Sequence, residues 1–132
     1  MKVIDKVAWI YIQDKKILST RSAGSEIWFL PGGKREPLEN DVETLTREIK
    51  EELDVEIDLS SLRYIGTFQA QAANHAQGVI VKMTCYTADY KGQIRPTSEI
   101  AEYAFLSTAD RDKISPVDQF IFTYLLENDW IE

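Results

Sequence analysis

The feature that most constrains the fold of this chain is a change of hydrophobic periodicity near residue 40. Beyond that point apolar residues recur at spacings of three and four, at Val42, Leu45, Ile49 and Leu53. Such spacing places them on one stripe of an α-helix. Asn40 or Asp41 can cap the start of this helix, with Glu43 in its first turn. We therefore predict an amphipathic helix over residues 40–53, whose stripe needs a second layer to cover it.

The segments on both sides of this helix favour β-strands, because they are rich in Val, Ile, Trp and Tyr. We expect strands at residues 3–12, 17–20, 62–70, 79–88 and 103–106. A short apolar run at residues 27–30 ends at Pro31-Gly32-Gly33, which we interpret as a break and a sharp turn.

A second helix is predicted near the end of the sequence. Ser115 can cap it, and Pro116 suits its first helical position. Its predicted apolar face consists of Val117, Phe120, Ile121, Tyr124 and Leu125. The 132 residues suit one compact domain, and no repeat or linker divides them. We therefore predict a single domain over residues 1–132, of the α/β (α+β) class, because strands flank a central helix.

Charge and rare residues exclude several functions. The formal net charge of -7 argues against a nucleic-acid or anionic-membrane surface, since both need basic patches. Cys85 is the only cysteine, so neither an internal disulfide nor a thiolate metal cage can form. His75 is the only histidine, and no nucleophile elbow accompanies it. The N-terminal segment resembles a strand rather than a signal peptide and no apolar run could span a membrane, so we expect a cytoplasmic protein.

Three acidic residues in the last turns of the predicted helix are the main indication of a chemical function. At about 100° per residue, Glu52 lies about 40° from Glu48 and Glu51 lies about 60° from it on the other side. All three should project from one sector, away from the apolar stripe. Carboxylates this close repel one another, and a hard divalent cation such as magnesium relieves that repulsion. We predict a magnesium site here, which manganese can also occupy; the alternative is a solvated acidic face.

The segment before the helix supports the metal hypothesis. Gly32 and Gly33 allow the backbone to approach a ligand closely, and a carbonyl there can supply a hard oxygen. Arg47 can pair with a carboxylate such as Glu39 and fix its orientation.

Residues 33–55 resemble the Nudix box. That pattern reads Gly, five residues, Glu, seven residues, Arg-Glu, an aliphatic residue, any residue, Glu-Glu, any residue, Gly and an aliphatic residue. The matching positions here are Gly33, Glu39, Arg47-Glu48, Ile49, Glu51-Glu52 and Val55. Asp54 replaces the last Gly, and Asp tolerates the left-handed conformation expected there better than most residues. The chain is thus identified as similar to the MutT-like Nudix hydrolases.

The resemblance implies a fold and a metal site. The fold would be an α/β/α sandwich with a central mixed β-sheet. Glu48, Glu51, Glu52 and the Gly32 carbonyl would hold magnesium, while Arg47 and Glu39 would orient the carboxylates. Water would attack a phosphorus of a nucleoside diphosphate linked to a further group. The general base stays open between Glu48, Glu51 and Glu99, which lies in a later loop.

The resemblance also suggests substrate contacts. Arg21, Lys34 and Gly33 are candidates to bind the phosphates, although general frequencies favour a solvated side chain for Arg21 and for Lys34. Markers of the ADP-ribose and dinucleoside-polyphosphate subgroups are absent at Ala70 and at residues 71–73. The default is therefore a nucleoside triphosphate, including damaged or non-standard deoxynucleotides. The alternatives are a catalytically silent nucleotide sensor and a hydrolase of ADP-ribose or a dinucleoside polyphosphate, and a homodimer stays open.

Overall fold

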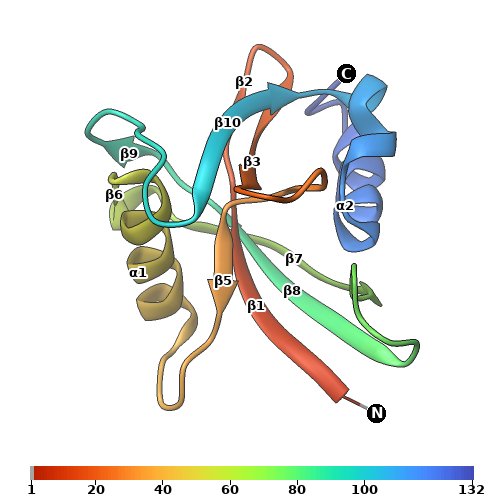
Figure 1. Cartoon of the computed structure of the whole chain (residues 1–132). Coiled ribbons are helices and arrows are strands. Elements are labelled where there is room, and N and C mark those ends of the chain that lie inside the picture. Colours follow the sequence, from red (N-terminus) through yellow and green to blue (C-terminus); the bar gives the residue numbers. More distant parts are fainter. Residues whose placement is uncertain (1) are drawn as a thin grey trace.

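The computed structural model describes residues 2–132, in which two four-stranded sheets lie between two helices and the short strands β6 (Glu56–Ile57) and β9 (Tyr90–Lys91) form a separate two-stranded sheet (Figure 1). The helices are α1 (Asp41–Leu53) and α2 (Pro116–Glu127), with short 3-10 turns at Leu59–Ser61 and Thr108–Lys113. The longer strands are β1 (Lys2–Ile10), β3 (Lys16–Ser22), β7 (Arg63–Gln71), β8 (Val79–Thr87) and β10 (Ile100–Leu106). The other short strands are β2 (Ile12–Gln13), β4 (Trp28–Phe29) and β5 (Gly32–Lys34).

The larger sheet is mixed and runs in the order β5-β1-β8-β7. Its central pair, β1 and β8, is parallel, whereas β5 and β7 join antiparallel. A second sheet has the order β10-β3-β2, with β4 added to β3. Figure 1 shows α1 and α2 on opposite sides of these sheets. This arrangement confirms the predicted α/β/α architecture with a mixed sheet.

Each helix covers its own hydrophobic cluster. Leu45, Ile49 and Leu53 of α1 are at most 1% exposed and pack with Val7 and Trp9 of β1. Full burial of each such side chain stabilises the fold by about 1.5–3 kcal/mol. The α2 cluster contains the other face of β1 and includes Cys85, which is fully buried as a small apolar side chain. β1 therefore contributes to both halves of the core, as does β3 through Ile17 and Leu18.

The ends of α1 follow the sequence closely. Asn40 is the N-cap, and it forms a reciprocal capping box with Glu43. Asp54 ends the helix in the left-handed conformation, with φ 58° and ψ 34°. Its backbone N–H donates to the Lys50 carbonyl at 3.1 Å. The helix end is therefore formed without the glycine that the Nudix pattern has at this position.

Two sequence-based expectations are wrong. Pro31-Gly32-Gly33 is not simply a break, because Gly32 and Gly33 belong to β5, which pairs with β1. Phe120 and Tyr124 do not lie on the buried face of α2, since they are 59% and 37% exposed. The face that packs on the sheet is formed by Val117, Ile121, Phe122 and Leu125. No helix among residues 2–132 is long and apolar enough to cross a membrane.

Asp118 is a fully buried carboxylate in the first turn of α2. Its Oδ2 accepts a hydrogen bond from the backbone N–H of Leu30 at 2.9 Å. Burial raises the pKa of Asp118 to about 7 from 3.8. The folded state thus favours the protonated acid, so its stabilising effect is complete below the unfolded pKa and is lost as the pH rises towards 7.

We expect Asp118→Asn to raise the melting temperature at pH 8 by about 5 °C, because the amide keeps an acceptor for Leu30 and carries no charge to bury. At pH 5 the difference from the wild type should be small. Melting curves at both pH values check this. An equal difference at pH 5 and pH 8 would show that the titration of Asp118 is not the cause.

Candidate active site

A cavity of about 350 Å³ lies where α1, β5 and the segment before β10 approach one another. Glu48 and Glu52 of α1, Gly32 and Gly33 of β5, and Glu99 line one side of it. The three carboxylates come from two parts of the chain that are about fifty residues apart in sequence. The fold therefore gathers acidic groups that the sequence separates.

Glu52 is the most deeply placed of these acids. Its Oε1 accepts a hydrogen bond from the backbone N–H of Gly32 at 3.0 Å. Burial raises the pKa of Glu52 to about 8, and the carboxylates of Glu48 and Glu99 act in the same direction. The side chain is therefore held in place by the glycine strand but lacks a full compensation for its charge.

Glu48 lies against Gly33, and the absence of a side chain at Gly33 makes this possible. A Cβ atom at position 33 would collide with the carboxyl group of Glu48. Burial raises the pKa of Glu48, while the neighbouring Arg47 guanidinium opposes that shift. The close approach of strand and helix thus fixes the position of this carboxylate.

Arg47 holds the two segments of the site together. Its Nε and Nη2 donate to the two carboxylate oxygens of Glu39 at 2.8 and 2.9 Å. Its Nη1 donates to Glu48 at 2.9 Å, and its Nη2 also reaches the Lys34 carbonyl at 3.1 Å. The Arg47 guanidinium holds the pKa of Glu39 at about 2, well below its usual range. The predicted pairing of Arg47 with Glu39 is confirmed.

We expect Arg47→Lys to reduce kcat/KM by about 10- to 100-fold while the protein still folds. An ammonium keeps the charge, but it cannot donate to Glu39, Glu48 and the Lys34 carbonyl at the same time. Steady-state kinetics and a circular-dichroism melt check this. Unchanged kinetics in the Lys variant would show that the charge alone is sufficient.

Glu99 reaches the cavity from the segment between β9 and β10. This segment is bound to the last turn of α1. The backbone N–H of Arg95 donates to the Leu53 carbonyl at 2.9 Å, and that of Thr97 donates to the Glu52 carbonyl at 2.8 Å. The Thr97 hydroxyl also donates to the Glu51 carbonyl. The carbonyls that a helix end leaves free therefore anchor the segment that carries Glu99.

Not every residue predicted for the site lies in the cavity. Its lining includes Gly32, Gly33, Lys34, Glu48, Glu52 and Glu99. Glu51 lies outside, with its side chain 54% exposed and 3.5 Å from Arg47. Arg21 belongs to β3 rather than to a loop, and its guanidinium binds Glu102 at 3.0 Å and the Ser25 carbonyl at 2.9 Å. The expected sector of three acids is therefore divided, with two facing the cavity and one facing solvent.

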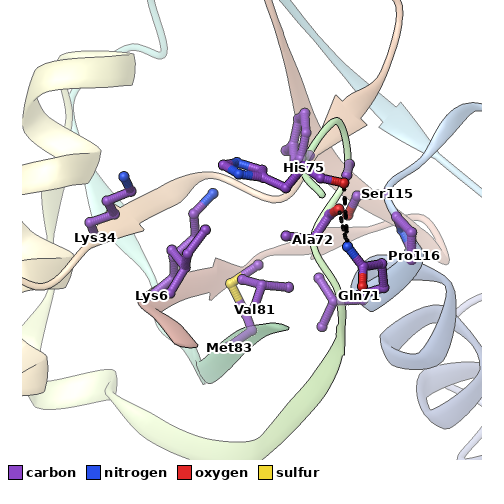
Figure 2. A pocket seen from close by; sticks show the side chains of 13 residues that line it. Lys6, Lys34, Gln71, Ala72, His75, Val81, Met83, Ser115 and Pro116 are labelled. Atoms are coloured by element: carbon purple, nitrogen blue, oxygen red, sulfur yellow. Dashed lines mark hydrogen bonds between the residues drawn. The ribbon is translucent and has the colours of Figure 1, made fainter. Parts of the chain in front are cut away.

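A second, mainly apolar hollow of about 120 Å³ adjoins the acidic cavity (Figure 2). The two share Lys6, Phe29, Lys34 and Met83 in their linings. Gln71, His75 and Ser115 add polar groups to the smaller hollow. Sequence analysis missed Lys6, although a lysine between the apolar residues of this strand was a visible signal. Together the hollows form one cleft with an acidic end and an apolar end.

The donors in the acidic cavity suit a hard divalent cation. Carboxylate oxygens are the ligands that magnesium prefers, and the raised pKa of Glu52 shows that burial disfavours its ionised form, a cost that a bound cation would offset. Among residues 2–132, no three acidic, histidine or cysteine side chains already converge as a complete cage. Magnesium commonly completes its ligand sphere with water and substrate phosphates. The residues present therefore fit the ion.

Fold and cavity together define an α+β hydrolase domain. A family model described as NUDIX domain matches residues 4–124. The CTP pyrophosphohydrolase of Escherichia coli (strain K12) is 33% identical over 100 residues, which cover 72% of this chain and 70% of that protein. The chain belongs to the Nudix hydrolase family.

Solved structures agree with this assignment. The solution structure of the E. coli ORF135 protein has 27% identity and a TM-score of 0.76, over 96% of this chain and 91% of that one. The crystal structure of the MutT protein from Methanosarcina mazei Go1 has 19% identity and a TM-score of 0.77, over 97% and 96%. At 19% identity, the likeness to the Methanosarcina mazei structure shows a shared fold only.

Proposed function

We propose that this chain is a magnesium-dependent pyrophosphohydrolase that converts a nucleoside triphosphate into a nucleoside monophosphate and pyrophosphate. The observation that carries this proposal is the buried Glu52 beside Glu48 and Glu99, in a cavity that continues into an apolar hollow. The relative named CTP pyrophosphohydrolase supports the same class of substrate.

Glu48, Glu52 and the Gly32 carbonyl would hold the cation, and Glu51 would join them by turning from its solvent-facing position. When bound, the ion neutralises phosphate charge and lowers the pKa of coordinated water. Arg47 keeps Glu48 and Glu39 in position through its hydrogen bonds. The cavity therefore needs little rearrangement of the backbone to bind a diphosphate.

Glu99 is our choice of general base over Glu48 and Glu51. It faces the cavity and, unlike Glu48, receives no hydrogen bond from an arginine among residues 2–132. A water oxygen forms a bond to phosphorus while one proton passes to the Glu99 carboxylate. The anhydride P–O bond breaks, and the leaving phosphate oxygen takes its electron pair. Lys34 and the Gly33 backbone, which line the same cavity, would bind the phosphates.

The apolar hollow is the candidate site for the nucleoside. Ile4, Val81 and Val117 give it an apolar surface, and the His75 imidazole adds a hydrogen-bonding group. The Gln71 amide is already bonded to the backbone of Ala76 and Gly78 and shapes the wall of the hollow. Binding sites for small molecules such as a nucleobase are typically lined by apolar side chains and a few polar groups. Because CTP is the substrate named for a relative, we propose a cytosine nucleotide first, with damaged or non-standard deoxynucleotides as the next candidates.

A nucleotide panel tests the proposal. Common and oxidised or methylated nucleoside triphosphates, ADP-ribose and a dinucleoside polyphosphate are incubated with EDTA, magnesium or manganese. Released pyrophosphate and phosphate are measured separately. We expect metal-dependent release of pyrophosphate from a triphosphate. Tight binding of one nucleotide without turnover under any metal condition would instead identify a sensor and overturn the proposal.

A further inference from the structure

Lys6 and Lys34 face one another in the cleft. They are direct Cα partners in the antiparallel pair of β1 and β5, so their side chains leave the same face of the sheet. Like charges directly opposite each other destabilise a strand pair. Neither ammonium forms a salt bridge or a side-chain hydrogen bond to another residue of the described chain, residues 2–132. The pair therefore places two positive charges side by side without a direct ion-pair partner among residues 2–132, an arrangement that suits an anion.

The lysine pair occupies the junction of the two hollows. Both residues line the acidic cavity and the apolar hollow alike. Figure 2 shows their side chains extending in the same direction, with His75 beyond the end of Lys6. The ammonium of Lys6 lies 5.5 Å from the centre of the Phe29 ring, which favours its partly buried position. The two positive charges thus separate the acidic end of the cleft from its apolar end.

We propose that Lys6, together with Lys34, binds the phosphate group attached to the nucleoside and determines the specificity of the cleft for 5′-phosphorylated nucleosides. This inference rests on the proposed function. A nucleotide whose base lies in the apolar hollow and whose outer phosphates lie near Glu48 and Glu52 must pass its innermost phosphate between the lysines. That phosphate remains on the nucleoside after cleavage, so the lysines also bind the monophosphate product without metal.

A purely structural role for Lys6 makes a different prediction. Its positive charge opposes the raised pKa of both Glu52 and Asp118, so Lys6 could serve only as their countercharge. In that case its removal would change stability and metal affinity but would not discriminate between a nucleotide and its nucleoside. Binding measured in EDTA separates the two roles, because metal affinity then has no influence.

The experiment compares Lys6→Met, Lys6→Arg and the matched control Lys2→Met. Lys2 is exposed on the same strand and outside both hollows, and its substitution changes the net charge equally. Dissociation constants of the four common nucleoside 5′-monophosphates and of their nucleosides are measured by calorimetry in EDTA. Kinetics with the best triphosphate in magnesium follow. If Lys6→Met does not fold, Lys6→Gln replaces it.

For the best-bound monophosphate, we expect Lys6→Met to weaken affinity at least tenfold and to raise KM more than it lowers kcat. Lys6→Arg should stay within about threefold of the wild type, Lys2→Met should match it, and nucleoside binding should not change. Equal monophosphate affinity in Lys6→Met and the wild type would overturn the inference. A loss of nucleoside affinity in Lys6→Met as large as its loss of monophosphate affinity would also overturn it. So would the absence of monophosphate binding by the wild type. Turnover by Lys6→Met with an unchanged KM would refute the phosphate-binding role of the two lysines and leave the proposed function intact. Absence of turnover in the wild type would refute the proposed function.

Discussion

Glu52→Gln is expected to lower kcat/KM by on the order of 10³-fold or more while the protein melts at the same or a higher temperature. A bound cation supplies several kcal/mol of transition-state stabilisation, and the amide cannot replace the carboxylate as its ligand. The amide oxygen still accepts the hydrogen bond from Gly32. The variant no longer carries a group that folding must either bury as a charge or protonate, so activity and stability should change in opposite directions.

The stability effect should depend on pH in the metal-free protein. Burial raises the pKa of folded Glu52 to about 8 from 4.5. The protonated acid is therefore favoured in the folded state, and its stabilising effect is lost as the pH rises from 4.5 to 8. Melting curves of wild type and Glu52→Gln in EDTA at pH 5 and pH 8, with activity assays in magnesium, check both parts. If Glu52→Gln retained turnover, Glu52 would not be a ligand of the metal.

Gly32→Ala and Gly33→Ala should have different effects, the first mainly on folding stability and the second mainly on activity. Gly32 has φ 144°, and a Cβ there would collide with the backbone of Val7 in β1. We expect Gly32→Ala to separate β5 from β1 and to cost several kcal/mol of folding stability, about 3 or more. At Gly33 the obstacle is only the flexible carboxyl end of Glu48. We expect Gly33→Ala to fold with a small change in melting temperature but to lose about 10²-fold or more in kcat.

Urea denaturation and steady-state kinetics on both variants test this contrast. Gly24→Ala is a useful control, since a Cβ there meets no atom and its positive φ of 82° reports the conformational penalty alone. Two alanine variants with the same loss of stability would contradict the structural distinction. Full activity in Gly33→Ala would show that the observed position of Glu48 is not the productive one.

Much of α1 was predictable because local rules determine it. The apolar stripe, the Asn40 cap and the left-handed Asp54 follow from side-chain chemistry within a few residues. Glu39 and Arg47 are eight positions apart, yet a fixed motif spacing was sufficient to predict their pairing. These predictions needed no knowledge of the tertiary structure.

The features that were missed depend on tertiary packing. Helical angles placed Glu51 with Glu48 and Glu52, but the Arg47 guanidinium and the neighbouring β5 decide which carboxylates face the cavity. The exposed Phe120 reflects the direction in which α2 packs, which the sequence pattern alone left ambiguous. Lys6 becomes a cleft residue only because β5 pairs with β1.

The hydrogen bonds from Arg95 and Thr97 to the end of α1 join two parts of the site into one cooperative unit. Fraying of the last helical turn must release these bonds, so the acids of the helix and Glu99 lose their relative placement in the same opening event. Partial unfolding at this point would therefore inactivate the proposed site as a whole, because the acids of α1 and Glu99 would separate together.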